Sequence, residues 1–540
     1  MKKCLLFVLM LMVIAGQLMA QATIAKLKYE EAEEAFVSND FVTTLSKLDE
    51  AEKILGGPNP KTLYLRISSQ FKLFKGEPAV DLEAMLDLRK NCNTYLAKYE
   101  TVDGIEDKYK EVYKMSEYIK SFAIPEPAFA NVQKGTATVT DIEEVADAYY
   151  LIENFKRAAD YFKRAADKGS ASAATKLAYL YHRGFGVKQD VDKGNALLEI
   201  GLKAGNADAY HTRAFSYRYG DEGMPKDSVK SLEYFRKSFE AALPLAEKGN
   251  AEYMFYAGRA LVDTKTADTT TGIEWITRSA NKGYVEGLAY LGGYYRSGTY
   301  VEQDNAKAMQ LFLKAVSKGS CYSMQRIAYM YYSGAGVTQD YTKAREWYEK
   351  ASDYGEDYST YQLGLIYENG RGVDKDYAKA IAYYELAGKK GYGQGYNSAG
   401  NMYYWGTGVT TDYSKCVKYY QKAAEADVLA AYNNLANTYY KGGNGITKDY
   451  AKAAEWYLKG AAKGHAWCMY NYGNMCYNGD GMPVDYAKAA EWYTKAAEKN
   501  NTDAMDKLYN MYYNGLGVKK DKKVAQEWAD KSAVIKAKQS

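Results

Sequence analysis

The sequence predicts an all-α solenoid built from helical hairpins. One aspartate recurs at intervals of 36 or 37 residues, with a single interval of 41, and a repeat of this length is typical of a solenoid. Each interval contains two stretches with the apolar spacing of an amphipathic helix, separated by a glycine. The recurring aspartates are Asp190, Asp227, Asp268, Asp304, Asp340, Asp376, Asp412, Asp449, Asp485 and Asp521.

The hairpin at residues 323–352 shows how one repeat is built. Gly334 follows the first helix, where a left-handed C′ residue favours glycine. Asp340 then has the right type and place to cap the second helix by accepting a hydrogen bond from a free backbone N–H. That second helix has an i, i+3, i+4, i+7 face. The face consists of Ala344, Trp347, Tyr348 and Ala351.

Two more positions recur in the first helix of most repeats. A small residue lies six positions before the glycine, which lets a neighbouring helix approach closely. A tyrosine lies three positions before it, able to bury its ring and keep its hydroxyl near the edge. Most of the 56 tyrosines are therefore expected to be architectural. The small residues are Ala178, Ala214, Gly292, Ala328, Gly364, Gly400, Ala436 and Gly473, and the tyrosines are Tyr181, Tyr217, Tyr295, Tyr331, Tyr367, Tyr403, Tyr439 and Tyr512.

These positions form a known pattern. G-x-G-V-x-x-D-x-x-K-A-x-x-W/Y-Y-x-K-A-A, seen at 479–497 and 370–387, closely resembles the Sel-one-like repeat, a relative of the tetratricopeptide repeat. The resemblance implies a right-handed α/α superhelical solenoid of about ten 36-residue hairpins, used as a protein-interaction scaffold. Two stretches depart from the pattern: 262–268 lacks the Gly-x-Gly loop, and 238–249 carries an insertion with Pro244. We expect a local irregularity there.

Five segments are predicted. Residues 1–20 resemble a signal peptide, because a charged start precedes an apolar run too short to span a membrane comfortably. Cleavage two residues later and an uncleaved N-terminal anchor are the alternatives. The protein is therefore expected to be exported, periplasmic or extracellular, with no stable membrane span after cleavage. Residues 21–124 are predicted to form a helical, tetratricopeptide-like domain of unknown role, 125–140 a linker, 141–535 the repeat array and 536–540 a tail.

Composition excludes several classes of protein. The formal net charge of +4 is too balanced for a strongly basic nucleic-acid binder, and no nucleic-acid partner is expected. A hydrophobic fraction of 47% excludes global disorder. The cysteines that follow the predicted signal peptide are odd in number and irregularly spaced, which favours buried free thiols over disulfides. Some bacterial secreted members of the resembled family carry one cysteine pair per repeat, and their reported penicillin-related activity is not expected here.

The sequence shows no complete catalytic or metal-binding motif. His182, His211 and His465 are isolated in sequence, and there is no HExxH motif, paired CxxC or P-loop. Two Ser-x-x-Lys motifs, 69–72 and 279–282, lack the partner motifs of penicillin-binding enzymes. We therefore predict no enzyme activity, no catalytic residue, no cofactor and no metal site.

One polar stripe departs from a purely structural pattern. Four successive repeats carry asparagine five positions before the glycine, although asparagine in a helix costs up to about 0.7 kcal/mol relative to alanine. The stripe is rotated by about 150° from the core face, so it should line the concave wall of a superhelix. It is either an amide ladder between repeats or a set of contacts to an extended peptide. The candidate partner-binding residues are Asn397, Asn401, Trp405, Asn433, Asn437, Lys441, Tyr470, Asn474, Asn478, Asn510 and Asn514.

These observations favour an exported, non-enzymatic scaffold that binds protein or peptide through its concave surface. The alternative is a cell-envelope enzyme or glycan-binding module acting on cell-wall polymer, since the aromatic residues near the asparagines could stack on sugar rings. An enzyme needs clustered acid–base or nucleophilic residues in a pocket, and the sequence shows no such cluster. A spacer that binds nothing tightly is the third possibility. The sequence does not identify the partner.

Overall fold

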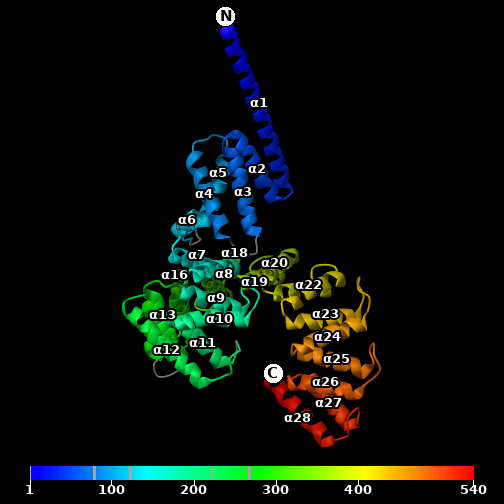
Figure 1. Cartoon of the computed structure of the whole chain (residues 1–540). Helices are drawn as coiled ribbons and strands as arrows, with labels where there is room; N and C mark the ends of the chain where they lie inside the picture. Colours follow the sequence, from blue (N-terminus) through cyan, green and yellow to red (C-terminus); the bar gives the residue numbers. More distant parts are fainter. Residues whose placement is uncertain (1, 77–80, 121–123, 221–222, 265–268, 540) are drawn as a thin grey trace. The chain divides into compact units, whose positions relative to one another are not determined.

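The chain is all-α. The computed structural model describes residues 2–76, 81–120, 124–220, 223–264 and 269–539, and no strand occurs in these ranges apart from one isolated bridge between Gly443 and Ile446. Side chains of residues 2–16, 18, 75, 76 and 539 are not described, so most of the predicted signal peptide and the repeat aspartate Asp268 lie outside the described side chains. Figure 1 follows the helices in chain order.

The chain divides into two compact units, residues 1–356 and 357–540. The first unit begins with six helices before the repeats. The predicted linker, 125–140, contains one of them, because Pro125 and Pro127 lie at the start of a helix, where a missing N–H is tolerated. These helices are α1 Lys2–Val37, α2 Phe41–Leu55, α3 Pro60–Gly76, α4 Leu82–Lys98, α5 Glu106–Lys120 and α6 Glu126–Lys134.

Helical hairpins follow in both units. In the first unit they are α7 Val139–Leu151, α8 Phe155–Asp167, α9 Ala171–Arg183, α10 Val191–Lys203, α11 Ala207–Tyr219, α12 Ser228–Glu247, α13 Ala251–Thr264, α14 Thr269–Asn281, α15 Val285–Ser297, α16 Asn305–Val316, α17 Cys321–Ser333 and α18 Tyr341–Asp353. In the second they are α19 Asp357–Asn369, α20 Tyr377–Lys390, α21 Gln394–Trp405, α22 Tyr413–Glu425, α23 Leu429–Lys441, α24 Tyr450–Ala462, α25 Ala466–Asn478, α26 Tyr486–Glu498, α27 Thr502–Asn514 and α28 Lys522–Gln539.

The repeating aspartate caps the second helix of each hairpin, as predicted. In α18, for example, the Asp340 carboxylate accepts a hydrogen bond from the Lys343 backbone N–H at 3.0 Å. The aspartate backbone N–H in turn donates to the carbonyl of the tyrosine three positions before the glycine, as Asp340 does to Tyr331. The same cap forms at Asp190, Asp227, Asp304, Asp376, Asp412, Asp449, Asp485 and Asp521.

The predicted glycine stop is confirmed, with one variation. Gly334 ends α17 in the left-handed conformation, with φ 75°, and the equivalent glycines behave alike in most repeats. Gly442 is the exception, because its ψ is −174°. Its loop is one residue longer than the common pattern, and the extra length closes through the Gly443–Ile446 bridge.

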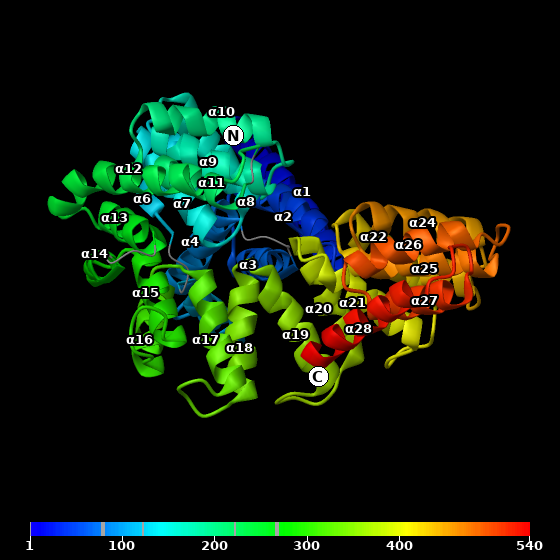
Figure 2. The ribbon, with the colours of Figure 1, turned by 90° about the horizontal axis from the view of Figure 1, so that it is seen from below.

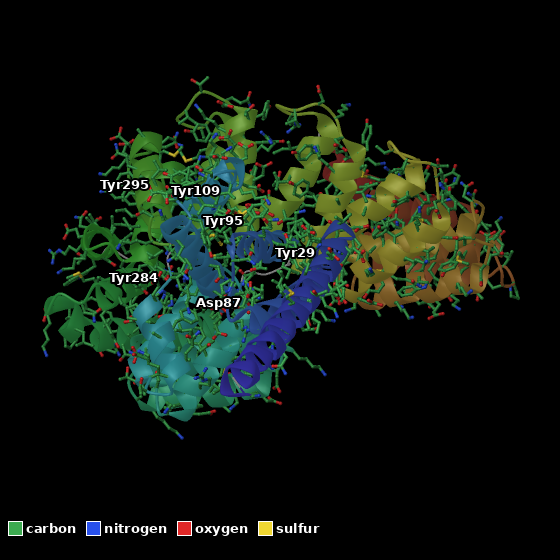
Figure 3. The ribbon with its side chains drawn as sticks, turned by 90° about the horizontal axis from the view of Figure 1, so that it is seen from above. Tyr29, Asp87, Tyr95, Tyr109, Tyr284 and Tyr295 are labelled. Atoms are coloured by element: carbon green, nitrogen blue, oxygen red, sulfur yellow. The ribbon has the colours of Figure 1, made fainter. Side chains whose placement is uncertain are left out.

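A lysine covers the recurring tyrosine. The Lys307 ammonium lies 4.1 Å from the centre of the Tyr295 ring and 2.6 Å from its hydroxyl oxygen. Figure 3 labels Tyr295, which belongs to α15. This lysine is the one in the D-x-x-K part of the repeat, so the pair joins the two helices of one hairpin. The same cation–π contact joins Lys193 to Tyr181, Lys230 to Tyr217, Lys343 to Tyr331, Lys379 to Tyr367, Lys415 to Tyr403 and Lys452 to Tyr439.

The small residue in the first helix allows close packing, as predicted. A Cβ on Gly400 would lie 2.6 Å from Cε1 of Tyr420, on the second helix of the same hairpin. Gly364 and Gly473 face Tyr384 and Tyr493 in the same way. These tyrosine rings are almost fully buried, so the glycine provides the space that each ring occupies.

The irregular stretch of the array is also visible. The insertion at 238–249 lengthens α12 to 20 residues, with Pro244 inside the helix. The loop that lacks the Gly-x-Gly pattern includes residues 265–268, which are outside the described part of the chain. On either side of this loop, α13 and α14 still pack closely as a hairpin, with Gly258 and Gly272 facing each other. A Cβ added to either glycine would lie within 3 Å of the carbonyl oxygen of the other.

One core joins distant parts of the first unit. Buried residues of α3, α4 and α7 share a continuous hydrophobic cluster with residues near α18, including Ala351 and Tyr354. The Tyr118 hydroxyl of α5 also donates to the Asp353 carboxylate. Figure 2 shows α9 to α18 following one another round an arc. The two ends of this arc therefore meet in one core, and the first unit is closed on itself.

The cysteines that follow the predicted signal peptide are buried, as predicted, and none of them forms a disulfide among the described residues. They are Cys92, Cys321, Cys416, Cys468 and Cys476. Among the described residues, no helix has both the length and the hydropathy needed to cross a membrane.

Candidate functional site

The predicted asparagine stripe lies on four successive first helices of the second unit, α21, α23, α25 and α27. Three of its members accept a hydrogen bond from the tyrosine that packs on the recurring small residue. The Tyr420 hydroxyl donates to Asn401 Oδ1 at 2.8 Å, and Tyr493 donates to Asn474 Oδ1 at 2.7 Å. Tyr457 donates to Asn437 Oδ1 at 2.5 Å. The stripe therefore joins the two helices of the hairpins α21–α22, α23–α24 and α25–α26.

Amides also bond between neighbouring repeats. Asn434 donates to Asn397 Oδ1 at 3.0 Å, and Asn471 donates to Asn433 Oδ1 at 2.8 Å. The donors are one helix position away from the predicted stripe, so sequence reasoning found only half of each pair. An inter-repeat amide ladder is thus present between α21, α23 and α25, and it offsets the cost of asparagine inside a helix.

The other stripe residues are less enclosed. Trp405 is 71% exposed, and the Lys441 ammonium lies 5.8 Å from its ring centre. Asn478, Asn510 and Asn514 are exposed. Asn478 donates to Asp480, and Asn510 and Asn514 donate to backbone carbonyls of their own helix. Tyr470 is half-buried on α25. The stripe thus combines bonded amides on α21 to α25 with exposed side chains, and its role in partner binding stays a prediction.

A cavity of about 360 Å³ in the first unit was not predicted from the sequence. It is lined from the first helices of five successive hairpins, α7, α9, α11, α13 and α15. Tyr179 and Phe215 in its wall lie five positions before Gly184 and Gly220, the register of the asparagine stripe. The lining residues are Asp147, Tyr150, Lys176, Tyr179, Arg183, Asp208, His211, Thr212, Phe215, Phe255, Tyr256, Arg259, Tyr284, Glu286 and Tyr290.

Most charges around this cavity are paired. The Lys176 ammonium lies 2.8 Å from the Asp147 carboxylate and 3.8 Å from that of Glu252. On the other side, Asp263 accepts from Arg259 at 3.1 Å and contacts His211 Nε2 at 2.9 Å. Burial and the nearby guanidinium of Arg259 lower the pKa of His211, despite its bond to Asp263, so this imidazole is neutral at neutral pH.

Two carboxylates have no such partner. Among the residues described, no cation forms an ion pair with Asp208 or Glu286. Burial raises the pKa of Asp208 to about 6 and that of Glu286 to about 7, and the Lys176 charge only partly opposes this effect. Carboxyl groups with raised pKa values in a cavity are candidates for a functional site.

The sequence held a signal for this cavity. Asp208, Glu252 and Glu286 each occupy the second position of a first helix, in the segments NADAY, NAEYM and YVEGL. An acidic residue there is also favoured by the helix dipole, so the pattern by itself indicates a helix start and not a site. Only the stacking of the helices shows that Asp208 and Glu286 face a common cavity, next to which Glu252 pairs with Lys176.

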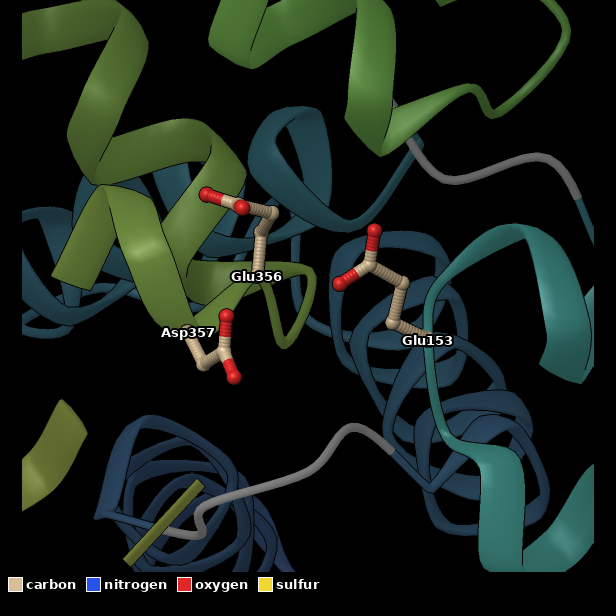
Figure 4. Close-up of side chains that lie close together, drawn as sticks. All are labelled: Glu153, Glu356 and Asp357. Carbon is tan, nitrogen blue, oxygen red and sulfur yellow. The ribbon is translucent and has the colours of Figure 1, made fainter. Parts of the chain in front are cut away.

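A second pair of carboxylates lies elsewhere in the first unit. Side-chain oxygens of Glu153 and Glu356 are within 4.8 Å of each other (Figure 4). Both residues have further interactions within the chain, which already engage these side chains. We therefore assign no metal to this pair.

Comparison with known proteins agrees with the repeat pattern. The Sel1 repeat matches eleven segments between residues 148 and 533. A protective antigen of uropathogenic Escherichia coli with an SLR fold is 28% identical over 76% of this chain and 90% of its own, with a TM-score of 0.42. A Sel1 repeat protein from Oxalobacter formigenes is 31% identical over 56% of this chain and 89% of its own, with a TM-score of 0.45. No curated protein matches the chain. Because the repeat covers most of its length, the chain belongs to the Sel1 repeat family.

Proposed function

We propose that this protein is an exported, non-enzymatic scaffold that binds a protein or peptide through the concave surface formed by its first helices. Sel1 repeat proteins are scaffolds of the protein-interaction type. The observation that carries the proposal is the cavity of the first unit, to which five successive first helices each contribute side chains. In the second unit the asparagine stripe occupies the same face of each first helix.

Site-specific photocrosslinking tests where a partner binds. A photoreactive phenylalanine analogue would replace Tyr290 in the cavity wall or Trp405 on the stripe, which are 40% and 71% exposed. Matched controls would replace Leu313 on α16 and Leu458 on α24, exposed residues of second helices. We expect a specific crosslinked protein from the first pair only. Crosslinks of equal yield from both pairs would contradict a concave binding surface.

The stripe has its own test. Changing Asn401, Asn437, Asn474 and Asn510 together to alanine removes the amides that could hold a peptide backbone. If the stripe binds the partner, the folded variant loses the crosslink from Trp405 but keeps that from Tyr290. An unchanged crosslink from Trp405, with circular dichroism equal to that of the parent chain, would assign these amides a structural role alone.

Export rests on the N-terminal sequence. Lys2 and Lys3 precede the apolar run from Leu5 to Ile14, and Ala20 offers a small residue for cleavage. Expression in a bacterium with an outer membrane, followed by fractionation and N-terminal sequencing, is expected to give a periplasmic or extracellular protein that begins at Gln21. A cytoplasmic protein that retains residues 1–20 would contradict export.

The alternative, an enzyme or glycan-binding module for cell-wall polymer, is favoured by one observation. Asp208 and Glu286 have raised pKa values in a cavity with aromatic walls, and such carboxyl groups serve as general acids in glycoside hydrolysis. Incubation with soluble cell-wall glycan fragments would reveal cleavage products by mass spectrometry. Products that disappear with Asp208→Asn would support an enzyme, and the absence of products would exclude cleavage of these substrates.

A further inference from the structure

We propose that the cavity of the first unit binds a cationic side chain, lysine or arginine, of the peptide partner, with the charged head between Asp208 and Glu286. This inference rests on the proposed function, because it names the chemical group that the concave surface recognises.

In the described part of the chain, the ion pairs around the cavity leave two of its carboxylates without a paired cation. Asp147 and Glu252 share the Lys176 ammonium, and Asp263 pairs with Arg259 and contacts the neutral His211. Asp208 and Glu286 are the two lining carboxylates in no ion pair among the described residues. A ligand that enters between them gains most if it brings a positive charge, because a partly desolvated carboxylate without a partner is costly.

The wall suits a cation. Tyr150, Tyr256, Tyr284 and Tyr290 line the same cavity, and the faces of aromatic rings attract cations. One ring already shows this behaviour, since the Arg259 guanidinium lies 4.3 Å from the centre of the Tyr290 ring. Carboxylates together with aromatic rings are the groups that recognise an ammonium or a guanidinium.

The pH dependence of binding follows from the groups that face the cavity. Binding of a cation favours the ionised carboxyls, so affinity should rise with pH as Asp208 and Glu286 ionise, near pH 6 and 7, and then level off. Burial works to lower the pKa of Lys176, but Asp147 and Glu252 outweigh it, so its ammonium stays charged in this range. His211 stays neutral and Arg259 stays charged, and Arg183 is the other guanidinium in the cavity lining.

Two matched peptides test the inference, with residues 21–540 as the protein. One is an acetylated and amidated heptapeptide of glycine and alanine with a central lysine, and the other replaces that lysine by norleucine, which removes only the ammonium. Ligand-observed NMR at pH 8 would measure both dissociation constants. We expect the lysine peptide to bind at least tenfold more tightly, and to bind at least fivefold more weakly at pH 5.5.

Variants locate the effect. Asp208→Asn and Glu286→Gln should each weaken binding of the lysine peptide at least fivefold and flatten its pH dependence. Asp192→Asn is the control, because Asp192 occupies the same second position of α10 but is exposed and outside the cavity. This control should change neither the dissociation constant of the lysine peptide nor its pH dependence.

The outcomes separate this inference from the proposed function. Equal binding of both peptides, or binding that the two cavity variants leave unchanged, would overturn the cation site. Failure of both peptides to bind would overturn it too. In each of these cases the photocrosslinks at Tyr290 and Trp405 still decide whether a partner uses the concave surface.

Discussion

At the scale of single residues, one missing side chain sets the distance between two helices. Gly292 of α15 is buried, and a Cβ there would lie 2.8 Å from Cε1 of Phe312 on α16. Its neighbour Gly293 would place a Cβ with no atom within 4 Å. A side chain at Gly292 would therefore clash with the neighbouring helix, whereas a side chain at Gly293 would not.

Gly292→Ala should destabilise the first unit by about 1–3 kcal/mol, because the added methyl overpacks the Phe312 ring. Gly293→Ala should stabilise it by about 0.5–1 kcal/mol, since alanine favours the helix and meets nothing. Chemical denaturation followed by circular dichroism compares the two variants. Equal shifts of the midpoint would show that α15 and α16 do not approach as closely as this geometry requires.

The tyrosine–asparagine bond gives a second prediction at this scale. Tyr493→Phe removes the donor to Asn474 and should cost about 1 kcal/mol. Combined with Asn474→Ala in a double-mutant cycle, the coupling energy should be about 0.5–1.5 kcal/mol. Asn478→Ala, an exposed control on the same helix, should stay within about 0.5 kcal/mol of the parent. A coupling energy of zero would show that this hydrogen bond does not offset the cost of asparagine inside the helix.

At the scale of the helical hairpin, the capping aspartate does two things at once. Its carboxylate satisfies a free N–H at the start of the second helix, and its backbone N–H holds the end of the first helix. For Asp340, Asp376 and Asp449, the hydrogen bond from the capped backbone holds the carboxyl pKa below its usual value of 3.8. One residue therefore ties the end of the first helix to the start of the second helix.

The cap predicts a pH effect with a definite sign. Because the folded-state pKa is depressed, the ionised aspartates stabilise the array above pH 4, and this contribution is lost as the pH falls through the folded pKa. Asp376→Ala should lower the unfolding midpoint at pH 7, whereas Asp376→Asn, which can still cap, should lower it less. The difference in unfolding midpoint between the parent and the asparagine variant should become smaller as the pH falls towards 3. A difference that is constant with pH would contradict a role for the charge.

At the scale of the whole unit, closure makes distant repeats depend on one another. A repeat array normally transmits stability only between neighbours. In the first unit, however, Tyr354 after α18 is buried in the same core as residues of α3, α4 and α7. The closed arrangement holds the cavity walls of α7 to α15 in place, which is what a binding site requires.

Hydrogen exchange can detect this closure. Tyr354→Ala should cost about 3–5 kcal/mol, as a large-to-small core change does, and should increase amide exchange in α7 and α8 as well as in α18. Tyr348→Ala is the control, because Tyr348 is equally buried in α18 but packs against Tyr332 of α17. Its effect should be confined to α17 and α18. Unchanged exchange of α7 and α8 in the Tyr354 variant would show that the two ends of the arc do not share a core.

The sequence by itself determined the hairpins. The aspartate cap, the glycine stop, the small residue and the tyrosine recur at fixed positions because each acts within one 36-residue repeat, so local chemistry suffices to predict them. The stripe was predicted by the same register, although its amide donors, Asn434 and Asn471, were missed because they lie one position to the side.

Only the tertiary structure decided what depends on several repeats together. The cavity carboxylates Asp208 and Glu286 are 78 positions apart in the chain, and in sequence each is an ordinary acidic residue at a helix start. The closure through Tyr354 and Asp353 joins residues separated by more than 200 positions. The rotation from one hairpin to the next sets such distances, and it results from the sum of many packing contacts, which no single repeat reveals.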